Sequence, residues 1–260
     1  MSAAGWDPDL VSAELVALTR SLGEPARDLV VLAEGNTSQR LDDGRLVVKA
    51  SGSSMRTATE EDFVVVEVDP LLELMSSPTA SQADLTAALD AGEHRGRRRR
   101  ASIETLVHVA AQAFTPTAFV GHTHPTAVVG LLSSVQAATA WDRHVYSDEA
   151  VVVGRPLFVP YASPGIDLGR AYLAGLRRHW ETHGELPTLV LLGNHGIVVN
   201  APSPDGVQAA SEMAVKGARV RATAYAAGGV APIAAASVEA FFTREDVVER
   251  RARLGGGSRG

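Results

Sequence analysis

Two short motifs contain three histidines whose spacing is suited to binding a metal ion. His122 and His124 stand two positions apart in GHTHP, and His195 lies in the turn GNHG. Side chains at positions i and i+2 of a strand point to the same face, so two such imidazoles can bind one divalent cation. A histidine in a tight turn between two apolar strands is well placed as a third ligand. Three histidine ligands leave a coordination position open, which is typical of catalytic rather than structural sites.

A catalytic centre also needs an acid or base, and Glu104 in SIETLVH is the carboxylate that we select. Its helix leads by a short connection into the strand that carries the histidine pair. The start of a helix favours an ionised carboxylate. His108 lies one turn further along the same helical face and could support it.

Each of these motifs also has an ordinary structural explanation. A histidine pair can lie half-exposed at the end of a strand. The histidine of a turn can simply hydrogen-bond to a backbone carbonyl group. A glutamate at a helix start can simply interact favourably with the helix dipole and have no catalytic role.

The composition limits the other kinds of chemistry. The 260 residues include no cysteine, which excludes disulfide bonds, thiolate metal ligands and a cysteine nucleophile. The only lysines are Lys49 and Lys216, and neither is a good candidate for Schiff-base chemistry. The net charge of −6 argues against a nucleic-acid surface, so the basic cluster HRGRRRR at 94–100 is expected to be a solvated loop. An RNA- or polyphosphate-binding patch is the alternative for that cluster.

The N-terminal sequence and the chain length indicate where the protein is located and how many domains it has. The N-terminal stretch MSAAGWDPDL lacks the basic and apolar regions of a signal peptide, and no apolar run approaches the ~20 residues of a membrane span. We therefore expect a cytoplasmic protein without a membrane partner. The length fits one large domain, residues 1–254, and the Gly-rich residues 255–260 are expected to be a disordered tail.

Hydrophobic patterning predicts the elements that must position these residues. Helices are expected at 9–22, 102–114, 126–134, 166–183 and 203–228. Strands are expected on both sides of a DDG turn at 42–44, at 62–69, at 117–124, at 150–161 and on both sides of the GNHG turn. The segment 76–100 is expected to be a surface excursion with one or two helical turns. Helices and strands do not alternate strictly, which favours one α/β domain with a mixed or largely antiparallel sheet flanked by helices.

With these segments in place, the sequence resembles the class II aldolase/adducin family. Five motifs occur in the family's order across about residues 9–230: GNTSQR at 35–40, KASG at 49–52, SIETLVH at 102–108, GHTHP at 121–125 and GNHG at 193–196. The resemblance implies a single α/β/α domain around a largely antiparallel sheet, usually in a fourfold-symmetric homotetramer. It implies that His122, His124 and His195 hold a divalent ion, commonly Zn²⁺, with Mn²⁺, Co²⁺ or Mg²⁺ as alternatives. It also implies that Glu104 is the acid/base residue and can ligate the metal when substrate is absent.

The resemblance further implies a phosphate site. The matching positions are small polar residues: Asn36, Ser51, Gly52 and Ser102. Hydroxyl side chains, free backbone N–H groups and a helix start with Ser102 as N-cap are suited to an anion, and Lys49 could add a charge. Ile103 stands where the fuculose-phosphate aldolases carry a second serine, and it is expected to face the core. The SIET motif and the long 76–100 segment are closer to the rhamnulose-phosphate aldolase half of certain fused enzymes.

The implied reaction is that of a metal-dependent carbon–carbon lyase. It would cleave or form a bond in a ketose phosphate, or in a related hydroxy-ketone or aldehyde, through an enediolate that the metal stabilises. Cleavage needs a further base, for which the family uses a tyrosine, and Tyr225 and Tyr146 are the candidates here, with simple packing as the alternative for both. A sugar-phosphate 4-epimerase, a dehydratase or a decarboxylase could use the same metal site. A non-catalytic adducin-like module is the alternative of another class, and it would not need the three histidines and the acid.

Overall fold

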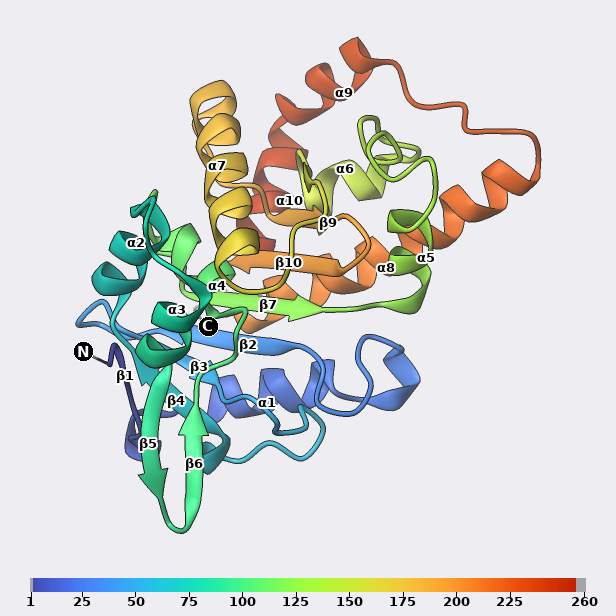
Figure 1. Ribbon diagram of the computed structural model, residues 1–260. Coiled ribbons are helices and arrows are strands. Elements are labelled where there is room, and N and C mark those ends of the chain that lie inside the picture. The colour runs from blue at the N-terminus through green and yellow to red at the C-terminus, as the bar shows by residue number, and fades with distance from the viewer. Residues whose placement is uncertain (1, 256–260) are drawn as a thin grey trace.

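An eight-stranded sheet runs through the middle of the protein, in the order β1-β4-β3-β2-β7-β10-β9-β8. The computed structural model describes residues 2–255, with side chains up to residue 250. The strands of the sheet are β1 (Ala4–Gly5), β2 (Asn36–Arg40), β3 (Leu46–Lys49), β4 (Phe63–Val66), β7 (Phe119–Thr123), β8 (Leu157–Val159), β9 (Leu189–Leu192) and β10 (Gly196–Ala201). Among these described strands, β8 and β9 are the one pair that runs parallel. The predicted α/β fold with a largely antiparallel sheet is confirmed (Figure 1).

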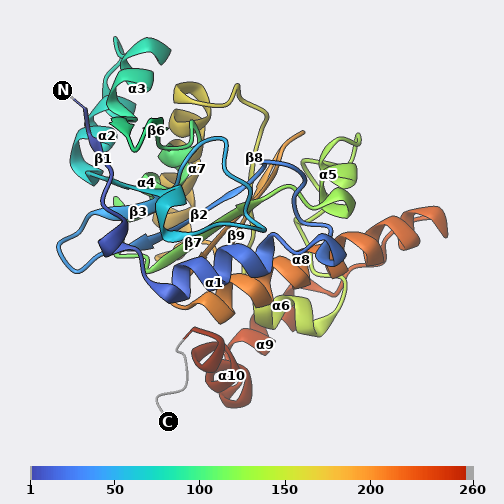
Figure 2. The same ribbon diagram turned by 90° about the horizontal axis from the view of Figure 1, so that it is seen from below.

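Helices cover both faces of this sheet (Figures 1 and 2). One layer contains α2 (Val68–Ser76), α3 (Gln82–Ala88), α4 (Thr105–Gln112) and α7 (Ile166–His183). The other contains α1 (Ala13–Leu22), α5 (Thr126–Leu132), α6 (Ser147–Val153) and α8 (Pro204–Ala226), and is followed by α9 (Ala235–Phe242) and α10 (Glu245–Gly255). Short 3-10 helices are η1 (Pro8–Leu10), η2 (Pro25–Arg27) and η3 (Glu60–Asp62). Among residues 2–255, none of the helices has the length and apolar character that crossing a membrane requires.

Successive residues of the central strands pack into two separate cores. On β10, Val198 lies in the core beneath α4 and α7, whereas Ile197 and Val199 lie in the core beneath α8. Side chains alternate between the faces of a strand, and both faces are covered here. Because both faces are buried, these strands have continuous apolar sequences, and those sequences allowed their prediction.

Several predicted elements occur where the patterning placed them. The DDG turn joins the antiparallel strands β2 and β3, and the GNHG turn joins β9 and β10. The expected helices at 126–134, 166–183 and 203–228 correspond to α5, α7 and α8. The C-terminal helices α9 and α10 were not predicted. Gly255 ends α10, and the rest of the predicted tail, 256–260, lies outside the described residues, so the tail stays a prediction.

Other expectations were wrong in whole or in part. Of the one or two strands expected at 150–161, β8 is present, but residues 150–153 belong to helix α6, whose acidic first turn and packing against α8 outweigh the β-branched run. The strand predicted at 62–69 ends at Val66 because α2 begins at Val68. The basic cluster is not a loop but part of a hairpin, formed by β5 (Asp90–His94) and β6 (Arg97–Arg100). Trp6 stacks on His94 with ring centroids 5.0 Å apart, a contact that local patterning does not show.

A buried ion pair joins α8 to α6. Arg221 is fully buried and Glu149 is 1% exposed, and the guanidinium contacts both carboxylate oxygens, with Nη2 3.1 Å from Oε2. Arg221 Nε also donates to the carbonyl oxygen of Ala140 at 2.5 Å. Burial by itself raises the pKa of Glu149, but His144, 3.6 Å from its carboxylate, and the hydrogen bonds and charge of Arg221 outweigh it and lower that pKa.

Replacement of Arg221 by alanine is expected to lower the free energy of unfolding by about 3–5 kcal/mol, because it leaves a buried charge without its partner. Urea denaturation measures the loss. Because the folded-state pKa of Glu149 is lowered, its contribution is present above the unfolded-state pKa and is lost as the pH falls through the folded-state value. The control is Arg244→Ala, whose partner Asp246 lies on the surface. Equal denaturation midpoints for the two variants would contradict the prediction.

Candidate metal centre

The four predicted residues of the metal centre meet at one end of the sheet. His122 lies on β7, His124 follows that strand directly, His195 lies in the turn between β9 and β10, and Glu104 immediately precedes α4. Strands β7 and β10 are neighbours, and the pairing of Ile197 with Thr123 brings the turn to the histidine pair (Figure 1). The His195 ring centroid lies 5.0 Å from that of His122 and 4.9 Å from that of His124.

The side chains of Glu104, His122, His124 and His195, called the His/Glu cluster below, converge through their donor atoms. The two Nε2 atoms of His122 and His124 are 3.0 Å apart. The carboxylate of Glu104 lies 3.1 Å from His122 Nε2 and 2.7 Å from His195 Nε2. One ligand atom from each residue lies within 4.8 Å of all the others. Three imidazole nitrogens and a carboxylate oxygen form a donor set that fits a divalent first-row cation, so these residues could hold one.

A hydrogen bond orients the ring of His122, and a carboxylate lies behind that of His124. His122 Nδ1 lies 2.8 Å from the carbonyl oxygen of Ile197, so this nitrogen carries the proton and donates. When the ring is neutral, the lone pair of His122 Nε2 is therefore free to bind a cation. Behind His124, Nδ1 lies 3.6 Å from a carboxylate oxygen of Glu34. Sequence reasoning missed Glu34, and its only sequence signal is its place just before the GNTSQR motif.

The protonation states of the cluster follow from burial and mutual attraction. Burial by itself raises the pKa of Glu104, but the charges and hydrogen bonds of His122 and His195 outweigh it and lower the pKa below its usual range. Burial lowers the pKa of His122, but Glu104 outweighs this, so the pKa of His122 is raised. Burial and repulsion from His122 lower the pKa of His124 to about 3. Glu104 is thus ionised at neutral pH, and His124 has the neutral form that binds metals.

The start of α4 differs from the prediction. The helix begins at Thr105, and Glu104 occupies the N-cap position without capping it through its side chain. Ser102 therefore lies two positions before the N-cap, and its hydroxyl oxygen accepts from the backbone N–H of Glu104 at 3.3 Å and from Asn36 Nδ2 at 3.0 Å. Ile103, expected in the core, is 43% exposed. The turn through 102–104 leaves the Glu104 carboxylate free to point into the cluster.

The comparison with protein families agrees with this geometry. Residues 13–222 match the model of the class II aldolase and adducin N-terminal domain. The chain belongs to the class II aldolase and adducin family. Among curated proteins, it is 29% identical over 172 residues to an uncharacterized oxidoreductase, YuxG of Bacillus subtilis (strain 168). The match covers 63% of this chain and 23% of that relative, so the chain spans less than a quarter of its length.

Solved structures share the fold of this class II aldolase family member. YgbL from Klebsiella pneumoniae is 20% identical with a TM-score of 0.66, covering 91% of this chain and 100% of that one. The N-terminal class II aldolase domain of a conserved protein from Thermoplasma acidophilum is 23% identical with a TM-score of 0.59, covering 80% and 91%. L-fuculose-1-phosphate aldolase from Thermus thermophilus is 19% identical with a TM-score of 0.57, covering 83% and 98%. At these identities the likeness establishes the fold alone.

The residues predicted from the family resemblance to bind phosphate surround the loop after β3. An isolated bridge between Ala50 and Ala101 places this loop beside Ser102. Ser51 and Gly52 are exposed, and a Cβ added to Gly52 would meet no atom within 4 Å. Within the described part of the chain, the backbone N–H of Gly52 donates to no other group. An open loop with a free N–H group is suited to an anion.

Lys49 lies beneath this loop. It is 1% exposed, and its Nζ donates to the carbonyl oxygens of Ser53 at 2.6 Å and Ala50 at 3.2 Å. Burial lowers the pKa of Lys49 to about 8. The side chain is more buried than its place at a strand end suggested. Both hydrogen bonds occupy the amine, so it supports the loop rather than projecting as a nucleophile.

The described contacts of the two candidate tyrosines are with residues outside the His/Glu cluster. The phenol of Tyr146 donates to Met213 Sδ at 2.6 Å, and Lys216 Nζ lies 5.2 Å from its ring centroid. Burial raises the pKa of Tyr146 to about 12. Tyr225 lies near the end of α8 and packs against the core beneath that helix. Within residues 2–255, neither phenol hydrogen-bonds to the cluster, so a tyrosine as second acid/base stays a prediction.

Gly196 leaves no room for a side chain beside the cluster. An added Cβ would collide with the carbonyl oxygen of Thr123 and lie 2.7 Å from Cδ2 of His124. We therefore expect Gly196→Ala to displace His124 and to lower the zinc content of the loaded, purified protein, measured by inductively coupled plasma mass spectrometry. Gly130→Ala is the control, because its added Cβ meets nothing within 4 Å. Equal zinc content in the two variants would refute this prediction.

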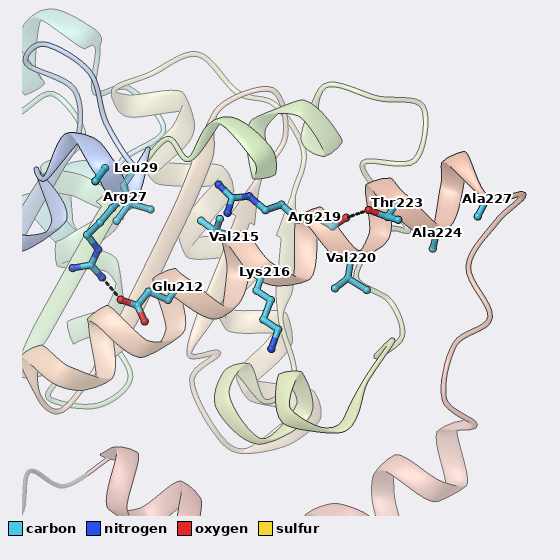
Figure 3. Close-up of a pocket in the computed structure, with 11 residues that line it drawn as sticks. Arg27, Leu29, Glu212, Val215, Lys216, Arg219, Val220, Thr223, Ala224 and Ala227 are labelled. Atoms are coloured by element: carbon cyan, nitrogen blue, oxygen red, sulfur yellow. Dashed lines mark hydrogen bonds and ion pairs between the residues drawn. The ribbon is translucent and has the colours of Figure 1, made fainter.

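A separate groove of about 780 Å³ runs along α8 (Figure 3). Arg27 and Glu212 form an ion pair across one end, with Nη2 2.8 Å from Oε1. Val215, Val220 and Ala224 contribute apolar lining from the helix. No residue of the His/Glu cluster lines this groove, so it has no part in the site described above.

Proposed function

We propose that this protein is a divalent-metal-dependent aldolase. Its substrate would be a ketose phosphate or a related hydroxy-carbonyl compound, in which it cleaves or forms a carbon–carbon bond. The observation that carries the proposal is the convergence of three imidazole nitrogens and the Glu104 carboxylate within 4.8 Å of one another. Membership of the class II aldolase and adducin family supports it, as does the fold shared with a protein named L-fuculose-1-phosphate aldolase.

The three histidines of the cluster would hold the cation. Imidazole ligands favour the later first-row metals, so we propose Zn²⁺, with Mn²⁺, Co²⁺ or Mg²⁺ as alternatives. When bound, a divalent cation acts as a Lewis acid that polarises the carbonyl group of the substrate.

Glu104 is proposed to move the proton at the donor carbon. In the bond-forming direction its carboxylate takes that proton, and in the cleavage direction its carboxyl group returns it. The lowered pKa of Glu104 keeps it in the base form at neutral pH. Asn36 Nδ2 donates to Oε2 of Glu104 at 3.1 Å, which orients the carboxylate next to the histidines.

The loop after β3 is proposed to bind the phosphate group. Ser51→Ala is expected to raise KM for a phosphorylated ketose by about tenfold, because it removes a hydrogen bond to a charged group. KM for the unphosphorylated ketose should not change. Steady-state kinetics with both sugars measure the difference, and Ser76→Ala, an exposed serine at the end of α2, is the control. If the substitution changes KM equally for both sugars, the loop does not bind the phosphate group.

The direct test of the proposed function is cleavage of a panel of ketose 1-phosphates with each of the four metals, read out as release of dihydroxyacetone phosphate. We expect at least one sugar to be cleaved in a metal-dependent manner. If no divalent ion co-purifies and none can be restored, the proposal fails. Borohydride reduction in the presence of a ketose phosphate tests the competing imine chemistry. Covalent trapping on Lys49 would overturn the metal mechanism.

A second candidate is an epimerase or decarboxylase that uses the same residues. YgbL, which shares the fold with a TM-score of 0.66, is named for three candidate activities: aldolase, epimerase and decarboxylase. Product analysis separates them, because an epimerase returns a ketose phosphate of unchanged mass and a decarboxylase releases carbon dioxide. A dehydratase would release water and give a product of lower mass. A non-catalytic adducin-like module would give no product, and the complete His/Glu cluster argues against it.

The proposal includes a homotetramer, as the family resemblance implies. Tyr146 or Tyr225 of a neighbouring copy could then supply the second acid/base, because neither phenol hydrogen-bonds to the cluster of its own chain among the described residues. Light scattering on the purified protein tests the assembly. A monomer that is fully active would exclude a tyrosine from a partner.

A further inference from the structure

A line of buried polar side chains leads from the sheet to Glu104. Asn36 and Ser38 stand two positions apart on β2 and lie beneath α4, which carries His108 one turn beyond Glu104. Asn36 and Ser38 are 1% exposed and His108 is fully buried. His108 Nδ1 lies 2.8 Å from Ser38 Oγ, and its Nε2 hydrogen-bonds to Asn36 Oδ1. The ring thus joins both strand residues.

Only one arrangement of protons satisfies all these contacts. Asn36 Nδ2 donates to Ser102 Oγ at 3.0 Å and to Glu104 Oε2 at 3.1 Å. The amide oxygen of Asn36 therefore faces His108, and because it can only accept, His108 Nε2 must carry a proton. Burial lowers the pKa of His108 to about 3, so the ring is neutral and Nδ1 is bare. Ser38 then donates its hydroxyl proton to Nδ1.

A histidine is costly at this position unless its hydrogen bonds have a role. The other buried residues of α4 include Leu106, Val107 and Val109, which pack with the apolar core. A polar ring buried among such neighbours lowers stability unless its nitrogens are bonded. Here both nitrogens are bonded, and one of the bonds ends on the residue that holds Glu104.

We infer that His108 is a positioning residue for Glu104, acting through the side-chain amide of Asn36. Its Nε2–H fixes which way the amide faces, and the Asn36 Nδ2 group then holds Oε2 of Glu104. Without that N–H, the buried amide oxygen has no donor, so the amide can shift and Nδ2 no longer holds the carboxylate in one place. The inference rests on the proposed function, in which Glu104 moves the proton.

Two variants of His108 separate positioning from packing. His108→Leu fills the space but donates no proton, and we expect kcat to fall by about 10- to 100-fold, with KM and zinc content close to those of the wild type. His108→Gln keeps an N–H at the reach of Nε2 and should restore most of the lost kcat. If both variants lose kcat equally, or if zinc and KM change as much as kcat, the ring only packs and the inference is wrong.

Nitrogen NMR of the wild-type protein tests the proton arrangement without any substrate. We expect one imidazole, absent from the spectra of both His108 variants, with a protonated Nε2 and a bare Nδ1 throughout the neutral pH range. The side-chain amide signals that Asn36→Asp removes should shift in His108→Leu and stay in place in His108→Gln. A protonated Nδ1 on this ring would overturn the inference.

The two measurements also distinguish the inference from the proposed function. If the wild type cleaves no ketose phosphate but the NMR results are as expected, the proposed reaction is wrong and the control of Asn36 by His108 stands. If the wild type is active and His108→Leu is equally active, the proposed function stands and the positioning role is excluded.

Discussion

Replacement of Glu104 by glutamine is expected to lower kcat for cleavage of a ketose phosphate by about 100- to 10,000-fold. The variant keeps the size of the side chain and an oxygen that can accept from Asn36. It cannot take up or return the proton at the donor carbon. The carboxylate lies 2.7 Å from His195 Nε2 and 3.1 Å from His122 Nε2, and the other three residues of the cluster are histidines, so none of them supplies a second carboxylate.

The measurement combines steady-state kinetics with metal analysis. The three histidines of Glu104→Gln are unchanged, so its zinc content should stay near that of the wild type. Glu34→Gln is the matched control, since Glu34 lies 3.6 Å from His124 Nδ1 and has no ion pair with His122 or His195 in the described part of the chain. We expect a much smaller loss of kcat in that variant. Unchanged kcat in Glu104→Gln with metal bound would remove Glu104 from the mechanism.

Replacement of His195 by alanine is expected to lower the affinity for Zn²⁺ by more than about 100-fold. Loss of a residue that only hydrogen-bonds to a metal ligand lowers metal affinity by about 10- to 100-fold, and loss of a ligand itself should cost more. The variant removes one of the three converging imidazoles, and the carboxylate of Glu104 loses one of its partners. Activity should fall with the metal and should return in part when excess Zn²⁺ is added.

Competition with a chelator at neutral pH measures this affinity. His183→Ala is the control, because His183 is exposed at the end of α7 and belongs to no metal cluster within the described residues. Its zinc affinity should equal that of the wild type. If His195→Ala binds Zn²⁺ as tightly as the wild type does, the turn histidine is not a ligand.

A comparison of α7 with α6 shows when the hydrophobic pattern of this sequence is sufficient to predict a helix and when it is not. Helix α7 has a helical apolar repeat along 18 residues, and its predicted and observed ranges agree. Helix α6 has only 7 residues, including three consecutive valines that suit a strand equally well. Its packing against α8 and the acidic residues of its first turn decided between the two structures.

The hairpin of β5 and β6 shows a second limit. Its arginines read as a solvated loop because the residue that stacks on the hairpin, Trp6, is far away in the sequence. Arg99 places its guanidinium 5.5 Å from the Trp6 ring centroid and is 4% exposed. Such a contact has no local signal, so a window of neighbouring residues cannot predict it.

By itself the sequence determined the donor types of the candidate centre. The absence of cysteine, the spacing of His122 and His124, and the turn that carries His195 restricted a metal site to histidine and carboxylate. Only the tertiary structure decided how these groups meet. The pairing of β7 with β10 brings His195 to the pair, and packing of α4 on β2 joins His108 to Asn36 across 72 positions of the chain. Local spacing fixes which faces side chains share, whereas distances, burial and pKa depend on contacts between segments that are distant in sequence.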